Sequence, residues 1–206
     1  QLDRLEKACE ELSGIRRKNA TVLTQKLKDA LIGLNFLTVE FDIAVRPGQT
    51  ITAKGYDDVE FLISTNPGES LKPLSQVASG GELSRIMLAI QTVLSAHDDL
   101  DTMIFDEVDT GISGSAAQKV GLKLHEVSRY AQVICITHLA QIACLADYHL
   151  LIQKQVTENK TYTQVIPLSK EAQIKEIARM IGGQAITPLL LQNAQEMIDS
   201  AKQLKS

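Results

Sequence analysis

Two short segments of the chain carry residue types that can hold phosphates and act on them. One is residues 78–85, Ala-Ser-Gly-Gly-Glu-Leu-Ser-Arg, in which a serine and two glycines open a helical pattern. The other is residues 102–107, Thr-Met-Ile-Phe-Asp-Glu, an apolar run that ends in two adjacent carboxylates. A glycine turn at a helix start can cradle a phosphate, and paired acids can hold Mg²⁺ and activate water. In this order the segments predict half of a nucleotide-hydrolysing site.

The serine and the glycines are expected to begin a helix. Ser79 and Glu82 have the spacing of a capping box, and the apolar residues after them recur at helical spacing. These apolar residues are Leu83, Ile86, Met87, Ile90 and Leu94. The helix is expected to run to about Ala96, and the unpaired amides of its first turn favour an anion beside Gly80 and Gly81. The alternative is an ordinary capped helix with a glycine turn.

The two carboxylates are expected at the carboxyl end of a buried strand. Residues 103–105 form the short apolar run that is typical of parallel strands, and open α/β sheets bind ligands at this edge. Asp106 is therefore a candidate Mg²⁺ ligand, and Glu107 is a candidate base for the attacking water. Asp109 adds a third acid to the same turn. The alternative is a strand that ends in solvated acids.

A second apolar strand, residues 132–137, ends at His138. A histidine at the end of a neighbouring strand can contact a terminal phosphate or respond to its loss. The alternative is a histidine that only makes structural hydrogen bonds.

In combination these motifs resemble the ABC-type ATPases and, within them, the RecN family of bacterial DNA-repair proteins, which are relatives of the SMC proteins. Residues 79–82 look like the signature motif, and residues 102–107 look like the Walker B strand with its catalytic glutamate. Residues 108–111 occupy the place of the D-loop, and His138 that of the switch histidine. The resemblance runs from about Leu34 to the last predicted helix.

The resemblance implies an α/β fold, the C-terminal lobe of an ABC/SMC-type ATPase head. It implies a P-loop NTPase-like sheet flanked by helices over residues 36–206, with a helical coiled-coil root over residues 1–35. The implied cofactors are ATP and Mg²⁺, the latter held by Asp106. Glu107 and His138 would be catalytic, the first as the base and the second in contact with the γ-phosphate. The implied nucleotide-binding residues are Ser79, Gly80, Gly81, Glu82 and Asp109, of which Asp109 would tie two sites together across a head interface.

The same resemblance implies the partners and the setting. Two heads would sandwich ATP and separate after hydrolysis, and the whole protein would act on double-stranded DNA ends in break repair and recombination. We expect a bacterial, cytoplasmic and nucleoid-associated protein. No Gly-x4-Gly-Lys-Ser/Thr sequence occurs in the chain, however. We therefore expect the P-loop in a separate N-terminal lobe of the same protein, and little activity from this chain alone.

Composition agrees with a globular, intracellular fold. The chain has 206 residues, of which 44% are hydrophobic and 22% charged, and no apolar run has the length of a membrane span. Its three cysteines have no metal-like spacing, which indicates a reducing compartment. A net charge of −4 and 4% aromatic residues give no basic DNA-binding footprint. The only basic cluster is residues 16–18, which is either a solvated helix face or a phosphate contact.

The remaining pattern predicts the elements around the motifs. Leucine spacing over residues 2–12 is that of a coiled coil up to Ser13-Gly14, and the alternative is one surface helix. The helix is expected to continue over residues 18–34. Strands are expected over residues 37–45 and 58–64, with a turn at Arg46-Pro47-Gly48. Further elements are expected as helices 115–128, 139–146, 171–181 and 188–204, and as a hairpin of strands 149–153 and 161–166 around residues 158–160.

Two other functions fit some of these residues. A metal-dependent nuclease or phosphatase could use Asp106, Glu107, Asp109 and His138, but two-metal sites draw carboxylates from several elements. A non-catalytic scaffold lobe would have no use for a base beside the metal ligand. A Ser-His-Asp hydrolase is not supported, because Ser79 lacks the Gly-x-Ser-x-Gly elbow.

Overall fold

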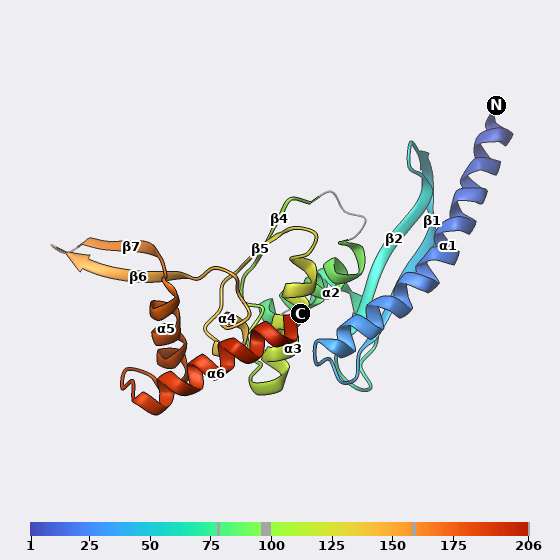
Figure 1. Ribbon diagram of the computed structural model, residues 1–206. Coiled ribbons are helices and arrows are strands. Elements are labelled where there is room, and N and C mark those ends of the chain that lie inside the picture. Colours follow the sequence, from blue (N-terminus) through green and yellow to red (C-terminus); the bar gives the residue numbers. More distant parts are fainter. Residues whose placement is uncertain (78, 96–99, 158–159, 206) are drawn as a thin grey trace. The chain divides into compact units, whose positions relative to one another are not determined.

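The computed structural model describes residues 1–77, 79–95, 100–157 and 160–205 (Figure 1). The chain divides into two compact units. We call residues 1–99 the N-terminal unit and residues 100–206 the C-terminal unit. Over the residues that the structure describes, none of the helices has the length and apolar character needed to cross a membrane.

The N-terminal unit packs a long helix against an antiparallel sheet, and a second helix packs against the first. Its strand order is β1-β2-β3, and the core lies where Leu27, Leu31 and Leu34 meet Phe41 and Ile63, all of them at most 1% exposed. The elements are α1 (Leu2–Gly33), β1 (Glu40–Thr52), β2 (Gly55–Ser64), β3 (Lys72–Pro73), the short 3-10 helix η1 (Leu74–Gln76) and α2 (Gly80–Leu94).

Helix α1 runs without a break through Ser13-Gly14, where the coiled-coil spacing of the sequence ends. Ser13 is 1% exposed, and its hydroxyl donates to Asp57 Oδ1 of β2 at 2.7 Å. Arg16 Nη1 donates to the other oxygen of Asp57 at 2.8 Å. These polar residues therefore dock the helix on the sheet, which local sequence does not reveal.

Strand β1 continues through the predicted turn at Arg46-Pro47-Gly48, which is therefore wrong. Arg46 and Pro47 still pair with β2, and the register shifts only between Pro47 and Thr52. A Cβ atom at Gly48 would lie 2.6 Å from the carbonyl oxygen of Tyr56. The glycine thus permits close approach of the two strands, as glycine inside a strand often does.

The C-terminal unit begins with a β-α-β arrangement. Strands β4 (Thr102–Phe105) and β5 (Gln132–Cys135) pair in parallel, joined by α3 (Gly114–Val127). The parallel pairing and the connecting helix confirm the predicted α/β character of this region. Then follow α4 (Ala140–Ala143), β6 (Leu150–Thr157), β7 (Lys160–Pro167), α5 (Lys170–Gly182) and α6 (Pro188–Lys205).

The last two helices pack on each other and on α4. Ile177 and Ala178 of α5, Ala194 and Ile198 of α6, and Ala140 of α4 form one buried cluster. The predicted helices and the β6–β7 hairpin are confirmed within a few residues at each end, although the helix expected over 139–146 is shorter. Of the predicted hairpin turn, residues 158–159 lie outside the described residues, as does Ala96 at the expected end of α2.

The two faces of the β4–β5 pair differ sharply in exposure. Met103 and Phe105 are 7% and 6% exposed, whereas Ile104 between them is 68% exposed. Its register partner Ile134 is 41% exposed, and Ile136 is 45% exposed. Parallel sheets are normally covered on both faces, so this pair has one apolar face that its own unit leaves open.

Candidate functional site

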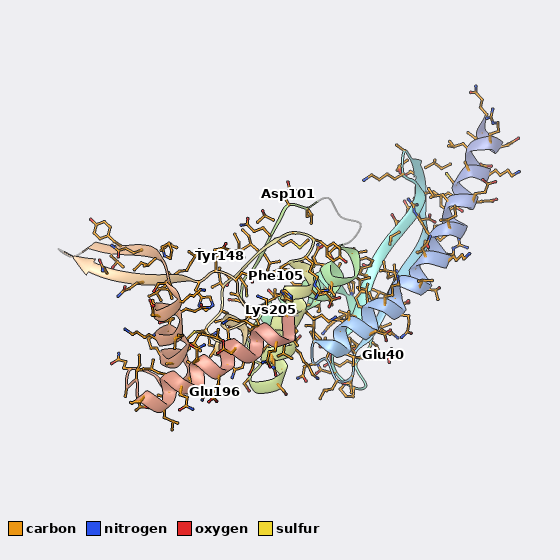
Figure 2. The ribbon with its side chains drawn as sticks, viewed as in Figure 1. Glu40, Asp101, Phe105, Tyr148, Glu196 and Lys205 are labelled. Atoms are coloured by element: carbon orange, nitrogen blue, oxygen red, sulfur yellow. The ribbon has the colours of Figure 1, made fainter. Side chains whose placement is uncertain are left out.

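The carboxyl ends of β4 and β5 bring the predicted catalytic residues to one edge of the sheet. Phe105 and Cys135 are register partners and the last residues of their strands. Asp106 and Glu107 follow the first strand directly, and His138 lies three residues after the second. Figure 2 labels Asp101 and Phe105, which bracket β4 and locate this edge.

The two carboxylates lie on a tight turn with an unusual backbone. Asp106 Oδ1 accepts the backbone N–H of Glu107 at 2.9 Å, and the carbonyl of Glu107 accepts the N–H of Thr110 at 3.1 Å. Glu107 itself has φ +58°. A glutamate rarely adopts this left-handed conformation, which costs on the order of 1–3 kcal/mol and is concentrated at functional sites.

Asp109 lies on the same loop and is only 3% exposed. Its Oδ2 atom accepts the Thr137 hydroxyl at 2.6 Å and the backbone N–H of His138 at 2.9 Å. The Nδ1 atom of the His138 ring lies 3.0 Å from the same oxygen. The buried carboxylate therefore joins the loop after β4 to the loop after β5.

His138 is held through its backbone N–H, while its side chain stays 73% exposed. Thr137, which precedes it, accepts the N–H of Leu139 on the hydroxyl that it donates to Asp109. Thr137 was not among the site residues predicted from the sequence, although it ends the predicted strand and lies in a stretch that resembles the family.

The pKa of the Cys135 thiol is affected by the acidic residues at this edge. Burial, and then the negative charges of Asp109 and Asp106, raise its pKa to about 12. The thiol is therefore protonated at neutral pH and is a poor nucleophile there. Over the described residues, no group of three or more His, Cys, Asp or Glu side chains has an arrangement that could hold a metal ion by itself.

Asp106 fits a Mg²⁺ site in which the protein supplies one carboxylate and the nucleotide and water supply the other ligands. Mg²⁺ is commonly bound through one or two carboxylates, with substrate phosphates and water supplying the other oxygens. Asp106 offers an exposed carboxylate at the strand edge, and its Oδ1 already accepts the Glu107 amide. One protein carboxylate therefore suits a metal that arrives with a nucleotide.

The serine-glycine turn has the predicted helix-start geometry, in the N-terminal unit. Ser79 is the N-cap of α2, with φ −92° and ψ 121°, and its hydroxyl accepts the N–H of Glu82 at 3.4 Å. Gly80 and Gly81 are the first helical residues, and Glu82 is the acidic residue of the first turn. The first amides of α2 and its dipole thus offer the expected anion-binding end.

The apolar residues of α2 are not all buried. Ile86 and Ile90 are buried, but Leu83 and Met87 are 38% and 40% exposed. Arg85 is instead 8% exposed, with its guanidinium 5.6 Å from the ring centroid of Phe36. Burial lowers the pKa of this arginine, while the aromatic face favours its charge.

The predicted site residues thus fall into two groups. Asp106, Glu107, Asp109 and His138 are gathered in the C-terminal unit, and residues 79–82 lie in the N-terminal unit. Their roles remain predictions, including a contact of Asp109 across a head interface. In the basic cluster, Arg16 is paired with Asp57 and Arg17 donates to Ser13, so these two arginines make intramolecular contacts.

Comparison with solved structures defines the fold. The Smc head domain with coiled coil and joint derived from Pyrococcus yayanosii matches with a TM-score of 0.56 and 20% identity, over 79% of this chain and 29% of that one. A structure described under ATP-driven dimerization and DNA stimulated activation of SMC ATPases matches with a TM-score of 0.50 and 17% identity, over 84% of this chain and 99% of that one. The chain therefore has the fold of SMC ATPase heads.

Comparison with curated proteins finds relatives that share one name. The DNA repair protein RecN of Bacillus subtilis is 53% identical over 156 residues, 76% of this chain and 27% of the relative. RecN of Halalkalibacterium halodurans is 43% identical over 198 residues, 94% of this chain and 35% of the relative. RecN of Haemophilus influenzae is 41% identical over 189 residues. The chain is RecN-like, as the motifs indicated, and spans about a third or less of these relatives. No protein-family model matches the sequence.

Proposed function

We propose that the chain is the C-terminal lobe of the ATPase head of an SMC-like, RecN-type protein that acts in DNA double-strand break repair and recombination. The observation that carries this proposal is the edge formed by β4 and β5. There an exposed carboxylate, a second carboxylate on a left-handed residue and a tethered histidine converge. The relatives named RecN are DNA repair proteins, which supports the biological role.

Each residue at this edge has a role in the proposal. Bound Mg²⁺ would neutralise charge on the phosphates of ATP, and Asp106 would hold it. Glu107 would orient and deprotonate the attacking water, and His138 would contact the γ-phosphate. Phosphoryl transfer depends on such positioning and charge stabilisation more than on covalent chemistry. The left-handed backbone of Glu107 supports this role, because strain of this kind is kept where it fixes a functional side chain.

The nucleotide needs a P-loop that this sequence does not contain. The open face of Ile104, Ile134 and Ile136 supports a second lobe that covers the β4–β5 pair, because a parallel sheet is otherwise buried on both faces. We assign this face to the N-terminal P-loop lobe of the same protein. The exposed Leu83 and Met87 of α2 leave further apolar surface beside the signature turn.

The signature turn would act on the nucleotide of a second head. Ser79, Gly80, Gly81 and Glu82 would bind the ATP held by the P-loop of the partner head, so that ATP joins two heads and its hydrolysis releases them. An SMC ATPase of the same fold is described with ATP-driven dimerization and DNA stimulated activation, which supports this arrangement. Asp109 would contribute to the same interface.

Helix α1 would be the root of the coiled-coil arm. Leu2, Leu5, Ile15 and Val22 remain between 46% and 68% exposed along it, which leaves apolar surface for a partner helix. Head closure would reach DNA through such arms in the full-length protein. We place this protein in the bacterial cytoplasm, associated with the nucleoid.

The proposal is tested by Glu107→Gln in a complete head, assembled from this chain and the P-loop lobe. We expect the variant to bind ATP and accumulate as a dimer, because glutamine keeps the shape but cannot take a proton from water. Size-exclusion chromatography with light scattering and a turnover assay would measure this. The control is Asp101→Asn, at the opposite end of β4, which should behave as wild type. Fast ATP turnover by Glu107→Gln would sink the assignment.

A further inference from the structure

The hydrogen-bond ladder of β4 and β5 ends beside the candidate catalytic residues. At this end of the parallel pair, the N–H of Ile136 donates to the carbonyl of Phe105 at 2.9 Å. Bonds in a parallel ladder are evenly spaced and recur at every second residue of each strand. The next bond in the series would therefore run from the N–H of His138 to the carbonyl of Glu107.

A side chain takes the place of that backbone bond. The carbonyl of Glu107, a residue with φ +58°, accepts the N–H of Thr110 at 3.1 Å. The N–H of His138 donates to Oδ2 of Asp109 at 2.9 Å. The same oxygen accepts the hydroxyl of Thr137 at 2.6 Å. The two strand ends therefore stay joined, although β4 no longer supplies a backbone acceptor.

The turn at Glu107 brings this carboxylate into place. Asp106 and Glu107 are exposed, whereas the next two residues, Val108 and Asp109, are 0% and 3% exposed. A continued strand would instead alternate between its two faces. We propose that Asp109 is a positioning residue whose carboxylate replaces the backbone bond between Glu107 and His138. Strand β4 can then turn out of the sheet at Glu107 while His138 keeps its place beside it.

This role needs an acceptor oxygen and not a negative charge. The bonds from Thr137 and His138 both end on one oxygen, Oδ2 of Asp109. The side-chain amide of asparagine has an oxygen with two lone pairs, which can accept the same two hydrogens. Asp109→Asn should therefore keep the two loops joined, whereas Asp109→Ala removes the acceptor.

The consequence for the ATPase site rests on the proposed function. Glu107 and His138 follow different strands, and the carboxylate of Asp109 fixes the spacing between their loops. Displacement of a catalytic group by about 1 Å can lower a rate by about 100-fold. Asp109 would contribute to the head interface through the position of these two loops of its own chain.

Amide hydrogen exchange of His138 measures the proposed bond directly. The 206-residue chain has four histidines, so ¹⁵N-histidine labelling gives four backbone signals, and that of His138 is the one lost in His138→Gln. We expect its exchange to be about tenfold faster or more in Asp109→Ala, because a charge-assisted hydrogen bond is lost. In Asp109→Asn it should stay slow.

The matched control is Asp101→Ala, at the other end of β4. Asp101 accepts the N–H of Gln132 through its backbone carbonyl, at 2.9 Å, so the loss of its carboxylate should leave the exchange of His138 as in wild type. Wild-type exchange in a folded Asp109→Ala would overturn the proposal.

The test stays decisive if Asp109→Ala does not fold. A His138 amide that exchanges in the wild-type chain as fast as in an unstructured peptide would overturn the proposal by itself. Fast exchange in a folded Asp109→Asn would overturn it as well, because the charge and not the acceptor would then hold the loop.

Turnover by the complete head is a second readout. Per folded molecule, kcat should fall in Asp109→Ala and be largely restored in Asp109→Asn, which a lost carboxylate charge would not allow. An equal loss in both variants would contradict the role of the acceptor oxygen. A wild-type head without turnover but with a protected His138 amide would remove the proposed function and leave the positioning role intact.

Discussion

The open face of the β4–β5 pair gives a quantitative prediction for assembly with the P-loop lobe. Ile104 is 68% exposed in this chain, and burial of a whole isoleucine side chain contributes ~1.5–3 kcal/mol. Covering the exposed part of Ile104 should therefore contribute about 1–2 kcal/mol to docking. Ile104→Thr keeps the β-branched shape suited to a strand but loses most of this gain.

We expect Ile104→Thr to weaken binding of the P-loop lobe by about 5- to 30-fold, which corresponds to this free energy. The chain itself should change little, by under about 0.5 kcal/mol in its free energy of unfolding, because the side chain faces solvent. Isothermal titration calorimetry with the purified lobe measures the first quantity, and urea unfolding of the chain measures the second.

Ile152→Thr on the β6–β7 hairpin is the matched control, since Ile152 is 56% exposed but lies outside the β4–β5 face. It should leave the dissociation constant for the P-loop lobe unchanged. The reasoning is refuted if Ile104→Thr binds the lobe as wild type does, or if the control weakens binding to the same extent.

Three further predictions concern the signature turn, the core and the contact of Ser13 and Arg16 with Asp57. Ser79→Arg should abolish ATP-driven dimerisation of the complete head while a single head still binds nucleotide; dimers in light scattering would contradict the signature assignment. Ile177→Ala, at a 0% exposed position of α5, should cost about 2–5 kcal/mol in thermal unfolding, whereas Ile181→Ala on the same helix, 37% exposed, should cost much less. Hydrogen bonds from Arg16 and Ser13 lower the pKa of Asp57, so its ionised form stabilises the fold fully above an unfolded pKa of about 3.9, and this stability is lost as pH falls through the lower folded pKa. Acid unfolding of Asp57→Asn should therefore depend less on pH in that range. An unchanged dependence of unfolding on pH would show that Asp57 does not titrate there.

Elements built on local patterns were predictable from the sequence. The capping box of Ser79 and Glu82, the apolar run before Asp106 and the helical spacing after Gly114 each report a local preference, and each element is present. The parallel pairing of β4 and β5 follows because two short apolar strands are joined by a helix.

Features that depend on distant partners were not predictable. Ser13 ends the coiled-coil spacing in the sequence, but its partner Asp57 lies 44 residues away and makes it a docking point. Asp109 reads as one more acid on a turn, whereas its partners Thr137 and His138 lie 28 and 29 residues along the chain. Arg85 is a charged residue without a local partner in the sequence pattern, and it is buried over Phe36. In each case a polar group is buried because a tertiary contact satisfies it.

The central claim, that this chain is one lobe of a split ATPase site, is tested most directly by steady-state ATP hydrolysis. The rate would be measured for the chain alone, for the chain co-purified with the P-loop lobe, and for the same pair with Glu107→Gln. The account predicts no turnover by the chain alone and Glu107-dependent turnover by the pair. Robust hydrolysis by the chain alone would contradict the claim that the chain needs a P-loop from another lobe. An inactive pair would favour a non-catalytic scaffold lobe instead.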